Sequence, residues 1–209
     1  MAEKHVRPAL RAHEELAITL PAWSDFGARL RRRSTRASDV RLSVGGDAVM
    51  PDDAVVTPAQ LAAYDQVFER LDETQQAILR ALEADESIQR QMAAELPGTP
   101  LRDAIRLTVV HVLNPQREGE AYVGYQFACG WDDEHELGVM THRGRVVSIG
   151  GGDTAFLSWI AKRDGGVVEG EVEAPKRAAR TATKKKPAAS KKKPAASKKK
   201  PAAKARKRA

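Results

Sequence analysis

The chain has 209 residues and a formal net charge of +7, from 35 Lys and Arg against 28 Asp and Glu. The charge is unevenly spread, because residues 174–209 contain 12 Lys, 4 Arg and no acidic residue, whereas the remaining 19 basic and 28 acidic residues leave residues 1–173 at −9. The single cysteine, Cys129, excludes an internal disulfide and fits a reducing compartment. No apolar run approaches the ~18 residues of a membrane helix and no signal-peptide core is present, so we expect a cytoplasmic protein with no membrane partner.

The composition predicts three parts. Residues 1–20 form a peripheral N-terminal segment, in which three leucines at helical spacing before Pro21 favour a short helix. Residues 21–165 have the mixed apolar and charged pattern of a folded domain. Residues 166–209 predict a disordered basic tail rich in Lys, Pro and Ala, because repelling lysines and regular prolines oppose collapse.

Two sequence features lie near the start of the domain. Residues 29–36 hold five arginines, which fits either a phosphate-binding patch or a solvated face that balances the acidic body. Val40, Leu42 and Val44 then alternate with polar residues, and Gly45-Gly46-Asp47 follows. This pattern predicts one half-buried strand and its turn.

The clearest helix start is Thr57-Pro58-Ala59-Gln60, where a capping threonine, a first-turn proline and a glutamine three residues later form a capping box. The apolar face of this helix is expected at Leu61, Tyr64, Phe68 and Leu71. A second helix is predicted over residues 73–95, with Pro97-Gly98 as its stop.

After residue 100 the periodicity becomes extended. Strands are predicted at residues 105–113, 122–129, 136–141 and 145–149, followed by a tight glycine turn and a final helix over residues 154–162 capped by Asp153. The expected fold class is α+β, an antiparallel β-meander of about four strands with helices packed on one face, plus the disordered C-terminal tail.

The centre of the domain resembles a known group of proteins. The sequence is similar to an uncharacterised family of bacterial domains that shares a W-D-x-E-H-G-L-G-V core. The similarity lies in the run Trp131-Asp132-Asp133-Glu134-His135-Glu136-Leu137-Gly138-Val139, in the preceding Gly124-Tyr125-Gln126-Phe127 and in the helix start at residues 57–64. The resemblance covers roughly residues 16–164. Glu136 stands where that family has glycine, which implies a changed turn before the third strand. The resemblance implies no established activity, although some small bacterial domains of this type lie beside toxin genes as immunity proteins.

The role of the motif is open between two interpretations. Its carboxylates and imidazole have the chemistry of a hard-metal site or a proton-transfer pair, and Cys129, His111 or His142 would add a softer ligand. Consecutive residues entering a strand point to opposite faces, however, and no paired zinc spacing is present. The alternative is a hairpin corner in which a tryptophan packs and an aspartate caps the turn. We expect no catalytic residue, no metal and no cofactor, and we single out as a motif of unknown role Trp131, Asp132, Glu134, His135 and Gly138.

The tail repeats Lys-Lys-Lys-Pro-Ala-Ala-Ser with a period of seven from residue 184. It resembles the Lys/Pro/Ala-rich tails of linker histones and bacterial histone-like proteins in composition and repeat. A cation of this density can lie along many phosphates and release their counterions. The residues expected to bind nucleic acid are Lys184, Lys185, Lys186, Lys191, Lys192, Lys193, Lys198, Lys199, Lys200, Lys204, Arg206, Lys207 and Arg208.

Together these features predict a non-enzymatic, nucleoid-associated protein that binds nucleic acid, chiefly DNA, without sequence specificity through its tail. The acidic body would recruit a protein partner or add selectivity. The alternative is an immunity-type module whose acidic body neutralises a basic partner, with the tail serving solubility or pairing with the body. The sequence does not distinguish DNA from RNA.

Overall fold

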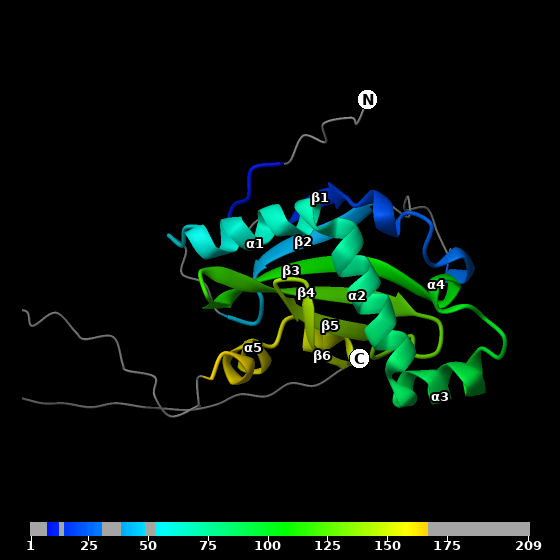
Figure 1. Ribbon diagram of the computed structural model, residues 1–209. Coiled ribbons are helices and arrows are strands. Elements are labelled where there is room, and N and C mark those ends of the chain that lie inside the picture. The colour runs from blue at the N-terminus through cyan, green and yellow to red at the C-terminus, as the bar shows by residue number, and fades with distance from the viewer. Residues whose placement is uncertain (1–7, 13–14, 31–38, 49–52, 167–209) are drawn as a thin grey trace, which may run out of the picture. The chain divides into compact units, whose positions relative to one another are not determined.

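The computed structural model describes residues 8–12, 15–30, 39–48 and 53–166, which contain one mixed sheet of six strands in sequence order (Figure 1). The strands are β1 (Leu16–Thr19), β2 (Asp39–Gly45), β3 (Ile105–Arg117), β4 (Glu120–Cys129), β5 (Leu137–His142) and β6 (Arg145–Gly150). The expected α+β class is confirmed. The expected meander of about four strands describes only β3 to β6, because β1 and β2 extend the same sheet.

The two added strands enter the sheet by different pairings. β2 lies parallel to β3, with Ser43 opposite His111, and β1 lies antiparallel to β2. A parallel pair needs a long crossover connection, which the helices between β2 and β3 supply. The helix predicted before Pro21 is wrong, because Ile18 is buried between exposed Ala17 and exposed Thr19, the two-residue period of a strand.

The helices are α1 (Pro58–Glu69), α2 (Leu71–Ala84), α3 (Glu86–Glu95), α4 (Leu101–Ala104) and α5 (Ser158–Asp164), with 3₁₀ turns η1 (Pro21–Trp23), η2 (Ala28–Leu30) and η3 (Gly152–Ala155). The capping box of α1 is confirmed, since Thr57 Oγ1 accepts from the Gln60 N–H and Gln60 Oε1 accepts from the Thr57 N–H. None of the described helices is long and apolar enough to span a bilayer.

The single helix predicted over residues 73–95 is two helices. The Asp85 carboxylate accepts the N–H groups of Ser87 and Ile88 and so caps a new helix, α3, where α2 ends. An aspartate competes with the helical backbone in this way because its short side chain bonds the N–H groups two and three residues ahead. The break turns α3 towards the end of the sheet that carries the tryptophan motif (Figure 1).

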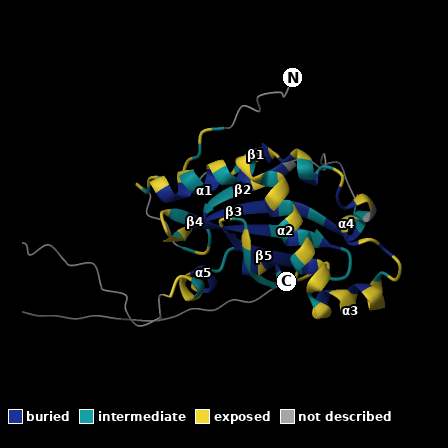
Figure 2. Ribbon diagram, viewed as in Figure 1, coloured by how far each residue is buried: buried dark blue, intermediate teal, exposed yellow. Residues whose placement is uncertain are grey.

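Helices cover both faces of the sheet, which corrects the expectation of one covered face. The larger core joins Tyr64 of α1 and Ile78 of α2 to Tyr125 of β4. A second cluster joins Ile160 of α5 to Tyr122 on the opposite face of the same strand. Buried segments accordingly run through the sheet beneath helices whose outer sides are exposed (Figure 2).

On the α5 face, η3 lies directly against β4 and β5. A Cβ on Gly124 would overlap the carbonyl oxygen of Ala155, and one on Gly138 would lie 2.8 Å from the Ala155 nitrogen and 2.9 Å from the Gly152 oxygen. Only glycine permits so close an approach of two backbones. Gly138, part of the motif of unknown role, therefore serves this packing.

Candidate functional site

The tryptophan motif forms a corner between β4 and β5. Asp132 Oδ1 accepts the N–H groups of Glu134, at 3.2 Å, and His135, at 2.9 Å, and both Asp132 oxygens lie 3.1 Å from His135 Nδ1. The pKa of Asp132 lies below its usual range chiefly because of the His135 N–H, with burial acting in the opposite sense and the His135 ring adding to the lowering. Trp131 packs, partly buried, against the larger core. These contacts favour the hairpin-corner interpretation.

The motif also lines a cleft of about 430 Å³ between the corner, the first turn of α3 and the glycine run after β6. The corner and the glycine run are joined by a hydrogen bond from the Gly152 N–H to the His135 oxygen, 2.8 Å long. The cleft is lined by three carboxylates and by no Lys or Arg. The carboxylates belong to Asp85, Asp132 and Glu136.

Beyond the Asp132–His135 pair, the side chains considered as metal ligands are not brought together in the part of the chain that the structure describes. Within the described ranges no group of three or more His, Cys, Asp or Glu is placed to hold a metal ion. The Cys129 thiol is buried, which raises its pKa to about 11, and it donates to the Asp132 carbonyl oxygen. His142, the last residue of β5, instead bonds the β3–β4 hairpin, with its Nε2 3.0 Å from the Arg117 oxygen. Glu134 is exposed and has no ion pair with any described residue.

Glu136 has a φ of 55°, in the left-handed region that favours glycine. A glycine would adopt this backbone conformation without strain, whereas Glu136 adopts it with a large side chain. The Glu136 carboxylate accepts a hydrogen bond from the Gln126 amide. This charge-assisted bond offsets part of the roughly 1 kcal/mol that a left-handed conformation costs a residue with a Cβ.

That hydrogen bond ends a polar chain that crosses three strands, β2, β3 and β4, to the corner before β5, and sequence reasoning missed it. Ser43 Oγ lies 3.2 Å from His111 Nδ1, and His111 Nε2 lies 3.0 Å from Gln126 Oε1. Because the Gln126 oxygen can only accept, His111 Nε2 carries the proton and Nδ1 accepts from the Ser43 hydroxyl. The signal available in the sequence was polar residues sharing one face of neighbouring strands.

His111 is held neutral within this series of hydrogen-bonded side chains. Burial lowers its pKa below the usual value, the Arg41 charge adds to the lowering, and the Gln126 hydrogen bond and the Glu15 charge oppose it. The Phe156 ring, centred 5.3 Å from the imidazole, covers the histidine. Neither Ser43 nor His111 lines the acidic cleft. The hydrogen bonds of this polar chain link β2, β3 and β4 in the register of the sheet.

The glycine run after β6 is a tight turn, as expected, but its capping differs. Gly151 precedes η3 without any side-chain cap, so the role expected of Asp153 is wrong. The backbone N–H of Ser158, which opens α5, instead donates to Asp47 Oδ1 at 3.0 Å. The acceptor comes from the turn after β2, 111 residues earlier, which explains why no local signal revealed it.

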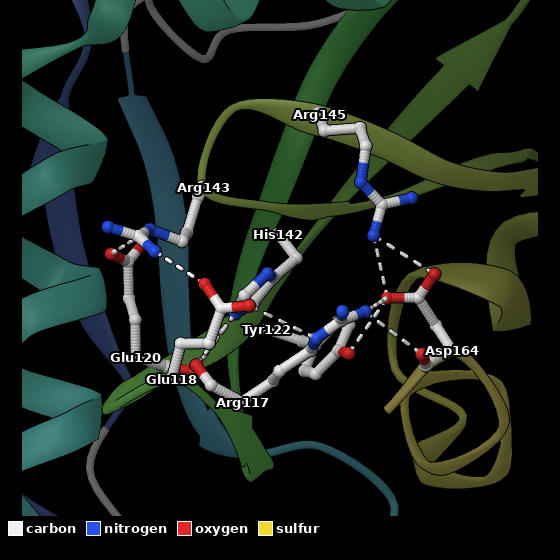
Figure 3. Close-up of polar contacts among 8 residues, drawn as sticks. All are labelled: Arg117, Glu118, Glu120, Tyr122, His142, Arg143, Arg145 and Asp164. Carbon is white, nitrogen blue, oxygen red and sulfur yellow. Dashed lines mark hydrogen bonds and ion pairs between the residues drawn. The ribbon is translucent and has the colours of Figure 1, made fainter. Parts of the chain in front are cut away.

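The end of α5 is fixed by a second polar cluster (Figure 3). Arg145 Nη2 donates to Asp164 Oδ1 at 3.0 Å and Oδ2 at 2.7 Å, and the Tyr122 hydroxyl donates to Oδ2 at 2.9 Å. Arg117 Nη1 lies 3.6 Å from the same oxygen. Burial raises the pKa of Asp164, but hydrogen bonds and charges from Arg145, Tyr122 and Arg117 outweigh it, so the pKa lies below its usual range.

Asp164→Asn is expected to destabilise the domain by about 1 to 2 kcal/mol at pH 7, because Arg145 and Arg117 lose their charged partner. A carboxyl whose pKa is lowered by folding stabilises the fold above its unfolded pKa of about 3.9 and loses that contribution as pH falls through the folded pKa. Urea denaturation at pH 7 and pH 3 should therefore show a difference between wild type and variant that shrinks in acid. The matched control is Asp153→Asn, because the Asp153 carboxylate is exposed and has no ion pair among the described side chains. An equal loss of stability in both variants would contradict the prediction.

The predicted nucleic-acid contacts from Lys184 to Arg208 lie outside the described residues, as do residues 31–36 of the arginine-rich segment. The fold and site together define a small α+β domain on a mixed sheet, whose tryptophan motif shapes a corner beside an acidic cleft. The chain belongs to the family described as Domain of unknown function (DUF6985), whose model matches residues 31–157. This match confirms the expectation of an uncharacterised family and ends before α5. No curated protein and no solved structure matches the chain.

Proposed function

We propose that this protein associates with nucleic acid without sequence specificity through residues 174–209, while the α+β domain has a separate, non-enzymatic binding role. The observation that carries the proposal is the separation of charge along the chain. Residues 174–209 hold 16 cations and no acidic residue, whereas residues 1–173 carry −9. An acidic domain is repelled by phosphate, so attraction to a polyanion has to come from the cationic segment.

The spacing of the cations supports the same conclusion. Three lysine triplets recur every seven residues, separated by Pro, Ala and Ser, which are small and uncharged. Duplex DNA carries one charge per ~1.7 Å of axis, so successive triplets meet phosphate wherever they fall. No Trp, Tyr or Phe lies among these residues, so base recognition is not expected from them.

A chain ending at Glu173 tests the proposal. We expect the full chain to bind a random-sequence duplex at about 100 mM salt and the shortened chain to lose at least about 100-fold in affinity, because its phosphate contacts are removed. Fluorescence anisotropy with a labelled duplex measures both affinities. Circular dichroism confirms that the shortened chain keeps its fold. Equal affinities would contradict the proposal and would direct attention to residues 29–36.

A second function is favoured by the acidic cleft, which has three lining carboxylates and no lining Lys or Arg. Such a surface fits a basic protein partner, as an immunity-type module would require. The chain ending at Glu173, which lacks the competing lysines, is the right species for the test. The function would be favoured if this chain is retained on polylysine in a salt-sensitive way and the double substitution Asp132→Asn with Glu136→Gln abolishes that retention. Retention that the double substitution leaves unchanged would count against it.

A further inference from the structure

Trp159 is unusually exposed for a tryptophan. It lies on α5 with 44% of its surface accessible, and the only other exposed large hydrophobic residues in the described part of the chain are Val55 and Leu61. The ring lines an open pocket of about 650 Å³. The pocket walls come from α5, the turn after β2 and the end of β3 near Asn114. An exposed aromatic in a pocket of this size is suited to bind a flat ligand.

The charges around Trp159 are basic, in contrast to the net charge of −9 over residues 1–173. Lys162 lines the pocket and has no ion pair with any described residue. The Arg163 guanidinium carbon lies 5.0 Å from the centroid of the Trp159 ring. The acidic residue of the lining, Asp47, is engaged by the N–H and hydroxyl of Ser158. The charge left for a ligand is therefore positive.

The pocket wall is held in place before any ligand arrives. Asp47 fixes the first turn of α5, and the Asp164 cluster with Arg145 fixes its last residue (Figure 3). Ile160 and Ala161, which follow Trp159, are buried in the core of this face. Trp159 thus projects from a helix anchored at both ends, which reduces the entropy lost on binding.

We propose that Trp159 stacks on a base of single-stranded nucleic acid while Lys162 and Arg163 contact the adjacent phosphates. Aromatic platforms beside cations bind single strands in this way, because every base offers a π-face. Bases in a duplex are already stacked on each other, so the site prefers single strands. The inference rests on the proposed function, in which residues 174–209 hold the polyanion.

The chain itself places the two binding elements within reach of one strand. Lys176, the first lysine of the cationic segment, is the tenth residue after Gly166, and ten residues span at most about 36 Å. A strand held by the lysines is therefore kept at high local concentration near the pocket. A weak stacking contact becomes populated under these conditions.

The test compares two single strands of equal length and charge, one with bases and one fully abasic, binding to the full chain at fixed salt. Wild type is expected to bind the base-containing strand about tenfold more tightly, which is within the range for stacking of one base. Trp159→Ala should reduce that ratio to about one without changing affinity for the abasic strand. Trp159→Phe should retain most of the preference, and Leu61→Ala, at another exposed apolar position, should retain all of it.

The outcomes separate the two proposals. The Trp159 site is overturned if wild type binds both strands with equal affinity, or if the base preference survives Trp159→Ala. Either result leaves the proposed function standing. Failure of the full chain to bind either strand overturns the proposed function and the Trp159 site with it. Thermal melts of the tryptophan variants show whether the domain stays folded. Trp159→Leu, which keeps apolar bulk but has no ring to stack, should also lose the base preference and replaces the alanine variant if that variant does not fold.

Discussion

Gly124→Ala is expected to destabilise the domain by about 3 kcal/mol or more, or to prevent folding. The added methyl would overlap the Ala155 carbonyl oxygen and lie 2.8 Å from the Ala155 Cα. Backbone rather than a flexible side chain occupies the space, so the clash is relieved only by moving η3 away from β4. η3 cannot retreat freely, because Ala155 is fully buried and the Gly152 N–H is bonded to His135.

Urea denaturation followed by circular dichroism measures this effect. Gly130→Ala is the control, since its Cβ would meet a methyl of the Leu96 side chain at 2.9 Å, and that flexible group can move. We expect the control to cost no more than about 1 kcal/mol. If Gly124→Ala proved as mild as the control, the packing of η3 on the sheet would be wrong.

The second large effect is expected from the lysine triplets. Replacing the nine lysines at residues 184–186, 191–193 and 198–200 with glutamine should lower affinity for a random duplex by at least about 100-fold near 100 mM salt. Glutamine keeps the length and polarity of the segment and removes only charge. The loss would therefore report phosphate neutralisation directly.

The matched control changes the same repeat without changing its charge. Pro187, Pro194 and Pro201 are replaced with alanine, and affinity should stay near that of wild type because the contacts are electrostatic. Anisotropy titrations at one salt concentration measure all three chains. A glutamine chain that binds as tightly as wild type would show that the lysines do not hold the nucleic acid.

Local sequence signals predicted the elements whose causes are local. The Thr57 capping box and the residue types and turns that bound strands β3 to β6 each depend on residues a few positions apart. The Asp85 break has a local signal too, because an aspartate before Glu86 and Ser87 is a helix cap, but a continuous apolar stripe obscured it. A strand at Leu16–Thr19 was mistaken for a helix because leucine spacing outweighed the alternation around Ile18.

Features with distant causes could not be predicted from one sequence. The parallel pairing of β2 with β3 depends on which strand the crossover helices leave adjacent. The polar chain from Ser43 to Glu136 and the capping of α5 by Asp47 join residues that only the folded sheet brings together. The candidate site was predicted in part, since Asp132 does cap the corner, whereas the cleft formed with α3 was not foreseen.

The salt dependence of duplex binding by the full chain tests the central claim most directly. A cationic segment that neutralises six to ten phosphates gives a plot of log affinity against log salt with a slope of about −5 to −9, and affinity falls by about 10³ to 10⁵ between 50 and 200 mM salt. The account predicts this steep slope for the full chain and its loss in the chain ending at Glu173. A shallow slope shared by both chains would contradict the claim that residues 174–209 hold nucleic acid by charge.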